Sequence, residues 1–570
     1  MPLPFPPTIL LAVGGLLLVG GRWVRDARWV AGLWFVAWIY VAYALTASGI
    51  AVDDAAARVV SRSLWRADRL AVSGEWLALA IGLLFGVGSI GMTSRGGTAH
   101  ERFGFLSFLI AGVMLVVSAH DAITLALSLE IVQFASVALH RLELDARCLA
   151  DAVKDAAHGL PRQANLSRDD ASLWLGLIAS LCVWLGLAFA ASLTASTQFE
   201  DMRIVLAQAY SPGPGRVAIG AGSKLGLLAM GLIVTGIGSR IGLVPWRAML
   251  AENVLRVGYW TSGCVLVSGQ LAGLFALARL CGTVWIGFAS ELIVLLIVLS
   301  SATLAIAGGL NARGLSTGEG SLRRWLVAFT MLHGAWLLIG VIAATGDLAA
   351  PENSLSVATG QPGALSLLIF STAASLLGLT GLFLLLNHLA RGDRDIEFLD
   401  ELLGLGQLSP VTATGLMIVL ASLIGHPPLW GCSGQWLLLV SGFNTRAVVA
   451  TGTLSVVSHQ GVIVLLIVAT LSSLIAAAVV VQFARVMFLE DPISRTRPQG
   501  GRASLVAGLS VALALITVGL FPSKLLVVIN GANQSLRIAP HAAPAGKPSG
   551  SATASALSTL RNGVGWPGLD

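Results

Sequence analysis

The chain has 570 residues, of which 56% are hydrophobic and only 11% are charged, and its mean hydropathy is +0.83. These values are typical of an integral membrane protein and exclude a soluble globular enzyme. The formal net charge is +6, but the basic residues are scattered among short segments and form no stripe, which argues against a nucleic-acid partner. We therefore expect the lipid bilayer to be the main surroundings of the chain.

Apolar runs of about 17 to 25 residues predict membrane-spanning helices along the whole chain. One boundary is weak, because only Ala119-His-Asp121 separates the fourth run from the fifth, and a re-entrant hairpin is the alternative. The expected fold is an all-α integral membrane protein with about 14 transmembrane helices. The runs lie near residues 8–20, 28–47, 75–93, 105–119, 121–140, 171–193, 222–242, 258–280, 285–308, 324–345, 363–388, 411–440, 461–483 and 503–521.

The distribution of Lys and Arg predicts the orientation of these helices. Loops that follow odd-numbered helices carry most of the 35 basic residues, and the positive-inside rule places such loops in the cytoplasm. Both termini are then expected on the non-cytoplasmic side. The tail from residue 539 to residue 570, which is rich in Ala, Pro, Ser and Gly, is expected to be disordered.

Two of the predicted helices contain an interruption by Gly and Pro. Ile241-Gly-Leu-Val-Pro245-Trp246 interrupts the seventh helix, and Gly425-His-Pro-Pro-Leu-Trp430 interrupts the twelfth. Proline removes a backbone donor, so a membrane tolerates such a break only where protein or a water-filled cavity receives the freed groups. Paired breaks five helices apart indicate two inverted five-helix repeats, with chance similarity as the alternative.

These repeats define the expected domain organisation. Residues 1–104 hold the first three helices, residues 105–280 the first inverted repeat and residues 281–485 the second. A C-terminal helix within residues 486–538 precedes the tail at 539–570.

Polar side chains inside the predicted helices are the candidate functional residues, because charges in membrane interiors are rarely kept without use. Glu130 lies in the fifth helix, and Arg240 lies beside the break in the seventh. Burial disfavours a charged carboxylate and a nearby cation favours it, so Glu130 is a candidate proton carrier, with a structural ion pair as the alternative. The other candidates are Gln270 in the eighth helix, His333 in the tenth, and His426 and Gln435 in the twelfth.

The sequence predicts no cofactor on this chain. Its five cysteines form no C-x-x-C pair, so neither an iron-sulfur cluster nor zinc is expected, and the cysteines are interpreted as packing residues. No G-x-G-x-x-G or P-loop motif stands between a strand and a helix, so we expect no NADH, flavin or nucleotide either.

Several collinear segments between about residue 75 and residue 521 match a known family pattern. The segment from Ala119 to Glu130 is similar to N-D-L-L-T-L-Y-L-G-L-E, and the segment from Arg240 to Arg247 is similar to K-L-S-L-V-P-F-H. Val267-Ser-Gly-Gln270 stands where the family has V-S-K.

Two further matches lie in the second half of the chain. Residues 322–336 resemble I-K-R-M-L-A-Y-S-S-I-A-H-A-G-Y, and residues 403–407 followed by 425–435 resemble G-L-G-R and G-I-P-P-T-A-G-F-I-G-K. The chain thus resembles the antiporter-like subunits of proton-pumping NADH:quinone oxidoreductase, or respiratory complex I, and most of all subunit N.

The resemblance implies a fourteen-helix subunit with two inverted repeats that takes part in proton translocation coupled to quinone reduction. It implies other membrane-arm subunits as partners, FMN, iron-sulfur clusters and quinone on those partners, and the cell inner membrane as location. Multisubunit cation/proton antiporters and membrane-bound hydrogenases share the same subunit fold and are alternatives. A purely structural membrane subunit is a third alternative.

The sequence departs from the family where protons are carried. In the family, a fifth-helix Glu modulates a seventh-helix Lys, and protons pass through an eighth-helix Lys toward a twelfth-helix Lys. Glu130 is kept, but Arg240 replaces the first lysine, Gln270 and Gln435 replace the other two, and Arg247 replaces the His after the proline. A guanidinium holds its proton and an amide does not titrate, so the lysine relay is absent.

Two interpretations of the proton path follow from these departures. In the first, Glu130 and Arg240 form a fixed ion pair, while water and His333 or His426 carry protons. In the second, translocation through this chain is lost and the chain persists as a scaffold, which is the interpretation we favour for its own channel.

Overall fold

A computed structural model describes most of the chain, and within the described residues the structure is almost entirely helical, with isolated β-bridges in place of strands. The described residues are 6–20, 27–53, 65, 68–90, 99–157, 171–210, 221–317, 320–349, 362–390, 395–445, 453–492 and 501–530. The predicted tail at 539–570 lies outside them.

Twelve helices in the described part of the chain are long and apolar enough to cross a membrane. Two shorter apolar helices, α1 and α16, add to these, and the predicted all-α membrane fold is confirmed. The helices are α1 (Pro6–Gly20), α2 (Ala27–Asp53), α3 (Arg69–Ser89), α4 (Ala99–Ser118), α5 (Ala122–Ala157), α6 (Ala171–Thr194), α7 (Phe199–Tyr210), α8 (Ala221–Ile241), α9 (Arg247–Arg256), α10 (Tyr259–Thr283), η3 (Ile286–Phe288), α11 (Ala289–Thr317), α12 (Leu322–Ala349), α14 (Ala364–Leu389), η4 (Leu399–Leu402), α15 (Leu405–Leu408), α16 (Pro410–Leu423), α17 (Trp430–Phe443), α18 (Thr453–Phe488), α19 (Arg502–Leu520) and α20 (Pro522–Ile529).

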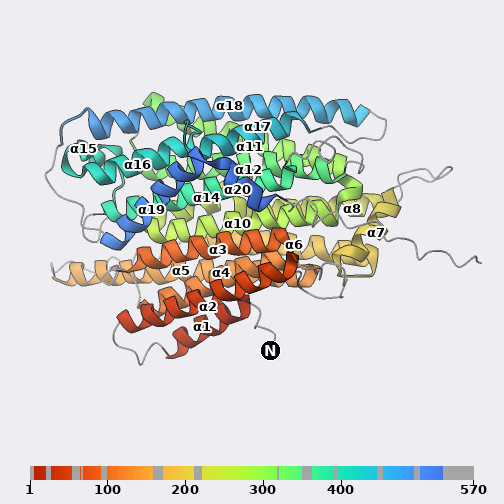
Figure 1. Cartoon of the computed structure of the whole chain (residues 1–570), viewed down its shortest axis with the longest axis horizontal. Helices are drawn as coiled ribbons and strands as arrows, with labels where there is room; N and C mark the ends of the chain where they lie inside the picture. The colour runs from red at the N-terminus through yellow and green to blue at the C-terminus, as the bar shows by residue number, and fades with distance from the viewer. Residues whose placement is uncertain are drawn as a thin grey trace, which may run out of the picture.

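The long helices run side by side along one direction (Figure 1). Helices α1 and α2 form one edge of the bundle, α18 forms the opposite edge, and α10 and α14 lie between them. The most apolar stretches of α10 and α12 are completely buried. Because lipid supplies little drive for helices to associate, close packing of small residues is needed. Gly236 of α8 shows this, since a Cβ there would lie 2.7 Å from the carbonyl oxygen of Ala179 on α6.

The weak boundary between the fourth and fifth predicted helices is a true helix boundary. Helix α4 ends at Ser118 and α5 begins at Ala122. The carboxylate of Asp121 accepts hydrogen bonds from the amides of Ile123 (2.9 Å) and Thr124 (3.3 Å), which satisfies donors that a helix start leaves free. Two separate helices, and not the hairpin alternative, are therefore present.

The two predicted helix breaks adopt the same backbone geometry. Gly242 and Gly425 have φ values of +86° and +80°, a region that favours glycine, and each is followed three residues later by a proline after a cis peptide bond. The backbone hydrogen bonds match as well: they join Leu243 N to Gly238 O and Trp246 N to Leu243 O in the first break, and His426 N to Ala421 O and Leu429 N to His426 O in the second. The predicted pair of broken helices is confirmed.

The order of elements repeats around these breaks. Helices α4, α5 and α6, the short α7, the broken pair α8–α9 and α10 are followed by α11, α12 and α14, the short η4 and α15, the broken pair α16–α17 and α18. Bridges at equivalent places join Asp121 to Gln198 in the first half and Ser321 to Phe398 in the second. The repeated order places one helix break in each half of the bundle.

Candidate functional site

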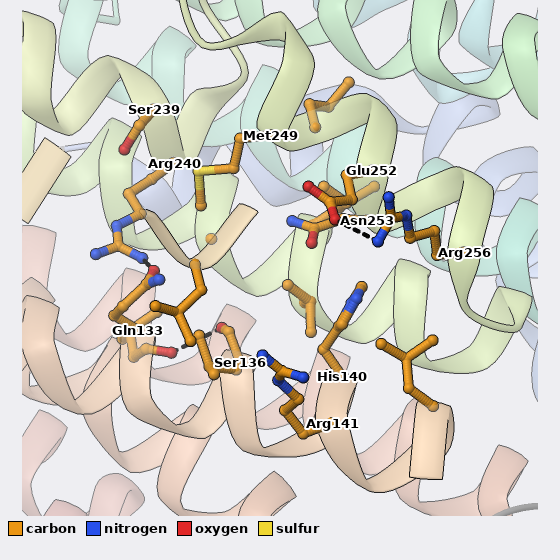
Figure 2. Close-up of a pocket in the computed structure, with 18 residues that line it drawn as sticks. Gln133, Ser136, His140, Arg141, Ser239, Arg240, Met249, Glu252, Asn253 and Arg256 are labelled. Atoms are coloured by element: carbon orange, nitrogen blue, oxygen red, sulfur yellow. Dashed lines mark hydrogen bonds and ion pairs between the residues drawn. The ribbon is translucent and has the colours of Figure 1, made fainter. Parts of the chain in front are cut away.

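A pocket with several charged and polar side chains in its lining lies between α5 and the first broken helix (Figure 2). Its volume is about 800 Å³, including the part that is open to its surroundings. Helices α5, α8, α9 and α10 supply most of its walls. Its polar and charged lining consists of Gln133, Ser136, His140, Arg141, Ser239, Arg240, Glu252, Asn253 and Arg256.

One face of α5 lines this pocket along its long direction. Gln133, Ser136, His140 and Leu144 recur at spacings of three and four positions, which places them in a row on the same side of a helix. At 1.5 Å of rise per residue, this row is about 16 Å long. The pocket therefore connects the outer part of α5 with the break after α8.

Arg240 forms the inner end of the pocket. It lies in the last turn of α8, and only 9% of its surface is exposed. Its guanidinium donates a hydrogen bond to Oε1 of Gln133 on α5 (Figure 2). It donates another to Oγ of Ser180 on α6, at 3.5 Å. Both partners are neutral, so the positive charge of Arg240 is not cancelled by direct contact.

The ion pair between Glu130 and Arg240, which the first of the two interpretations required, is not formed among the described residues. Glu130 is half-buried, and its charge acts on Arg240 without a direct contact between them in the described structure. Gln133 follows Glu130 by three positions, so the same face of α5 presents an amide to the guanidinium one turn further along. The neutral amide satisfies Arg240 and leaves the Glu130 carboxylate in a partly exposed position, which avoids the cost of burying it.

Gln270 joins the first helix break to α12. Its side chain is fully buried, and its Nε2 donates to the carbonyl oxygens of Ile241 (3.1 Å) and Thr330 (2.9 Å). His333 lies one turn after Thr330 and is 1% exposed, and neither of its ring nitrogens has a hydrogen-bond partner among the described residues. A Cβ at Gly334 would lie 2.6 Å from the Ile241 carbonyl oxygen, so glycine is required for this close approach.

Gln435 has a similar place at the second break. It is half-buried, and its Nε2 donates to the carbonyl oxygen of Leu423, the last residue of α16, at 2.8 Å. The carbonyl groups in the last turn of a helix have no partner inside the helix. Gln270 and Gln435 thus each bind a carbonyl at the end of a broken helix.

The remaining predicted site residues lie apart from this centre. Arg247 is the first residue of α9 and is exposed, and His426 lies within the second break and is exposed too. The structure thus brings Arg240, Gln270 and His333 together around the first break. It leaves Gln435 with His426 at the second.

Several polar contacts were not predicted from the sequence. Arg279 of α10 forms a buried ion pair with Asp68, which precedes α3, at 3.0 Å. Arg323 of α12 forms another with Asp395, also at 3.0 Å. An arginine inside the apolar run 258–280 was a visible signal for the first pair, because a charge at that place needs a partner. The sequence could not identify the partner, which lies 211 positions away.

No metal centre is found in the described part of the chain, where no group of three or more His, Cys, Asp or Glu side chains could hold a metal ion. Cys264 and Cys281 are buried, while Cys182 and Cys432 are half-buried.

The contact made by Gln270 predicts a measurable stability effect. Replacing Gln270 by leucine removes the donor shared by the Ile241 and Thr330 carbonyls, and a buried group left without its partner costs about 1–3 kcal/mol. We expect Gln270→Leu to lower the free energy of unfolding in detergent by that amount. Ser268→Ala is the matched control, since Ser268 is fully buried on the same helix and its hydroxyl has no partner to lose. Equal stability of the two variants would contradict the prediction.

The chain is similar in sequence and in fold to membrane proteins of known complexes. No protein-family model matches the chain. The chain is 26% identical over 516 residues to NADH-quinone oxidoreductase subunit N of Desulfovibrio desulfuricans, a match that covers 85% of this chain and 90% of the relative. The chain resembles subunit N of NADH-quinone oxidoreductases. Other curated relatives with the name subunit N match at 22–26% identity over most of the chain.

Chains of solved membrane complexes share the fold of this chain. A chain of respiratory complex I from Thermus thermophilus matches with a TM-score of 0.66 and 18% identity, over 92% of this chain and 99% of that one. A chain of the Mrp complex from Dietzia sp. matches with a TM-score of 0.67 and 15% identity, over 93% of this chain and 96% of that one. At these identities the structural matches establish the fold alone. The predicted resemblance to antiporter-like membrane subunits is confirmed.

Proposed function

We propose that this chain is a membrane-arm subunit of a proton-translocating NADH:quinone oxidoreductase, in which electron transfer from NADH to quinone is coupled to proton movement. The observation that carries the proposal is similarity to subunit N over 85% of the chain, together with paired helix breaks of the same geometry. The partners would be other membrane-arm subunits of the complex. FMN, iron-sulfur clusters and quinone would lie on those partners.

The proposed place of the chain is the cell inner membrane, with both termini on the non-cytoplasmic side, as the basic loops favour. We also propose the division into residues 1–104, two inverted repeats at 105–280 and 281–485, and a C-terminal helix within 486–538. The matched order of helices on either side of residue 285 supports this division.

A subunit of a multisubunit cation/proton antiporter is the second candidate. The structural match to the Mrp complex is as good as the match to respiratory complex I, so the fold does not separate the two. Sequence similarity to proteins with the name subunit N favours the first candidate.

For this chain's own channel, we propose that proton transfer by the family's lysine relay has been lost. The candidate path consists of Glu130, Arg240, Arg247, Gln270, His333, His426 and Gln435. A guanidinium does not release its proton under working conditions, and amides do not titrate. The amides of Gln270 and Gln435 are occupied by backbone carbonyls at the two breaks. The contacts of Gln270 and Gln435 with backbone carbonyls support a structural role at positions where the family has proton-carrying lysines.

Deletion of the gene in the native organism tests the assignment to the complex. We expect membrane vesicles from the deletion strain to lose NADH-driven quinone reduction that is coupled to acidification, because a missing membrane-arm subunit prevents assembly. The full chain should restore both activities. Unchanged coupled activity in the deletion strain would contradict the assignment, whereas loss of cation/proton exchange alone would favour the antiporter.

Replacement of Glu130 tests whether this chain transfers protons itself. We expect Glu130→Gln, introduced into the deletion strain, to restore NADH oxidation with an unchanged number of protons moved per NADH. Glutamine keeps the shape of the side chain and removes only the titrating group. A lower proton yield with intact assembly would show that Glu130 belongs to a working path. The complementary variant carries Arg240→Lys, Gln270→Lys and Gln435→Lys together.

A further inference from the structure

Glu75 is a second buried carboxyl group inside the membrane-spanning bundle. It lies in the second turn of α3, a candidate membrane span, and only 5% of its surface is exposed. Within the described residues, its carboxyl group has neither a hydrogen-bond partner nor an ion-pair partner. A carboxyl group without a partner at membrane depth is unusual, because each buried polar group normally has one.

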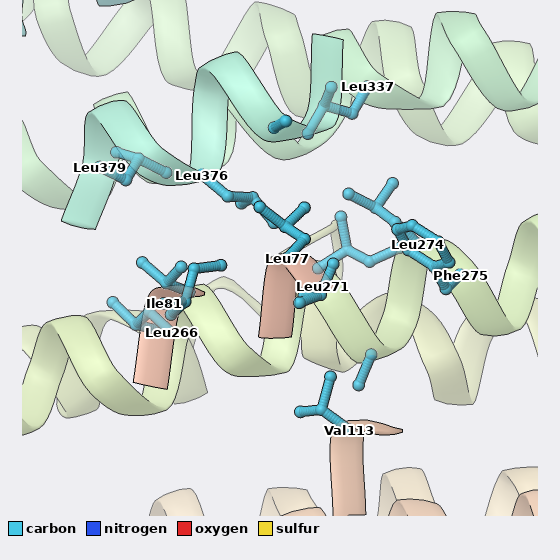
Figure 3. Close-up of a cluster of buried hydrophobic side chains, with 14 of the residues drawn as sticks. Leu77, Ile81, Val113, Leu266, Leu271, Leu274, Phe275, Leu337, Leu376 and Leu379 are labelled. Atoms are coloured by element: carbon cyan, nitrogen blue, oxygen red, sulfur yellow. The ribbon is translucent and has the colours of Figure 1, made fainter. Parts of the chain in front are cut away.

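The surroundings of this part of α3 are apolar. A Cβ at the neighbouring Gly74 would lie 2.4 Å from Val117 of α4 and 2.6 Å from Phe275 of α10, which shows how tightly the three helices pack there. Leu77 points into a buried cluster with Leu274 and Phe275 (Figure 3). Apolar side chains cannot stabilise a carboxylate by hydrogen bonding.

The charged groups nearest to Glu75 are already paired with one another. Asp68 and Arg279 are the side chains whose charges act on Glu75. The guanidinium of Arg279 donates through Nη1 and Nη2 to Asp68 and through Nε and Nη2 to the carbonyl oxygen of Val117. Arg69, at the same end of α3, donates to the carbonyl oxygen of Asn530. Among the described residues, the cation whose charge acts on Glu75 is therefore already engaged by Asp68 and Val117.

The far end of α3 holds further charged groups of the helices around it. Gly88, near that end, accepts a hydrogen bond from Ser504 in the first turn of α19 and lies beside Leu384 in the last turns of α14. Helices α2 and α4 run antiparallel to α3, so their first residues lie at that end too. The charged groups there are Arg28, His100, Glu101, Arg102, His388 and Arg502.

We propose that Glu75 is a proton-binding site, which takes up and releases a proton at the end of the bundle where Asp68 and Arg279 form their ion pair. An unpaired carboxylate in apolar surroundings is costly, and binding a proton removes the charge. The site is separate from the pocket at Arg240. It is a property of this chain alone and does not depend on the proposed partners.

Labelling with dicyclohexylcarbodiimide tests this site in native membranes. The reagent partitions into apolar regions and adds to a protonated carboxyl group, and the product rearranges to a stable N-acylurea that mass spectrometry can locate. A glutamate in water is almost fully ionised at pH 7, because its ordinary pKa is about 4.3. We expect modification of Glu75 at pH 7 to exceed that of Glu252, which is paired with Arg256 at 3.0 Å, by at least about tenfold. Labelling should fall as the pH is raised toward 10.

An infrared measurement decides the matter if the reagent cannot reach the site. A protonated carboxyl group has a C=O stretching band that a carboxylate and an amide lack. The band assigned to Glu75 should be present at pH 7 in the wild-type chain, decrease at higher pH and be absent from Glu75→Gln. Glu130→Gln is the control and should keep the band. Absence of both label and band at pH 7, or a label and band that do not change with pH, would overturn the proposal.

Discussion

Replacing Arg279 by alanine should lower the free energy of unfolding by about 3–5 kcal/mol, because removal of one partner from a buried ion pair leaves the other charge uncompensated. Arg279 and Asp68 are 1% and 3% exposed, and two parallel hydrogen bonds of 3.0 Å join them. Asp68 also accepts a hydrogen bond from the amide of Ala71, and Arg279 binds the carbonyl oxygen of Val117 near the end of α4. The pair thus holds the start of α3, the end of α4 and α10 together.

Unfolding in detergent, followed by the reaction of a thiol-specific dye with the buried Cys264 and Cys281, measures this effect. Arg256→Ala is the matched control. Arg256 also forms an ion pair of 3.0 Å, with Glu252, but its side chain is 39% exposed, so we expect a loss of at most about 1 kcal/mol. If Arg279→Ala destabilises the chain no more than this control does, the buried pair is not the structural link that we describe.

Replacing Arg323 by alanine should loosen α9 and destabilise the chain by about 3–5 kcal/mol as well. Nη1 of Arg323 lies 2.8 Å from the carbonyl oxygen of Val254 and 2.7 Å from that of Val257, and Nη2 lies 3.0 Å from Asp395. A cation at the end of a helix stabilises its unpaired carbonyls. The guanidinium also lies over the ring of Tyr259, 5.1 Å from its centre. Arg323, which lies in the second half of the chain, therefore holds the end of α9, and α9 is one of the walls of the pocket.

Hydrogen exchange distinguishes this local effect from general destabilisation. In Arg323→Ala, amides of residues 247–257 should exchange faster, while those of α3 and α4 keep their protection. In Arg279→Ala, amides of α3 and α4 should exchange faster, while those of residues 247–257 keep their protection. Arg324→Ala is the control for the first variant, because Arg324 is the next residue in the chain but is exposed. Equal exchange of α9 in the wild-type chain and Arg323→Ala would contradict the anchoring role.

The fold could be predicted because membrane crossings depend on local composition. Runs of apolar residues located the crossings, and the Gly and Pro pair in each half located the breaks at Gly242 and Gly425. Boundaries were less accurate where a helix continues beyond the apolar run. Helix α5 extends to Ala157, although its apolar run ends near residue 140, because the more polar residues that continue it carry no hydropathy signal.

The candidate site was only partly predictable, because long-range partners leave no local pattern. The residues Arg240, Gln270 and His333 were identified from the chain, and they do meet at the first break. Of the two interpretations, the one with an ion pair between Arg240 and Glu130 is not met, because sequence spacing does not show which turn of α5 faces α8. The amide of Gln133, one turn away from Glu130, takes that place.

Purification of the tagged full chain from its native membrane in mild detergent tests the central claim most directly. The measurement is whether NADH:quinone reductase activity co-purifies with the tag, with the accompanying subunits identified by mass spectrometry. We predict co-purified activity, together with subunits that carry FMN and iron-sulfur clusters. Recovery of the chain with cation-antiporter subunits, or alone and without activity, would contradict the assignment to the oxidoreductase.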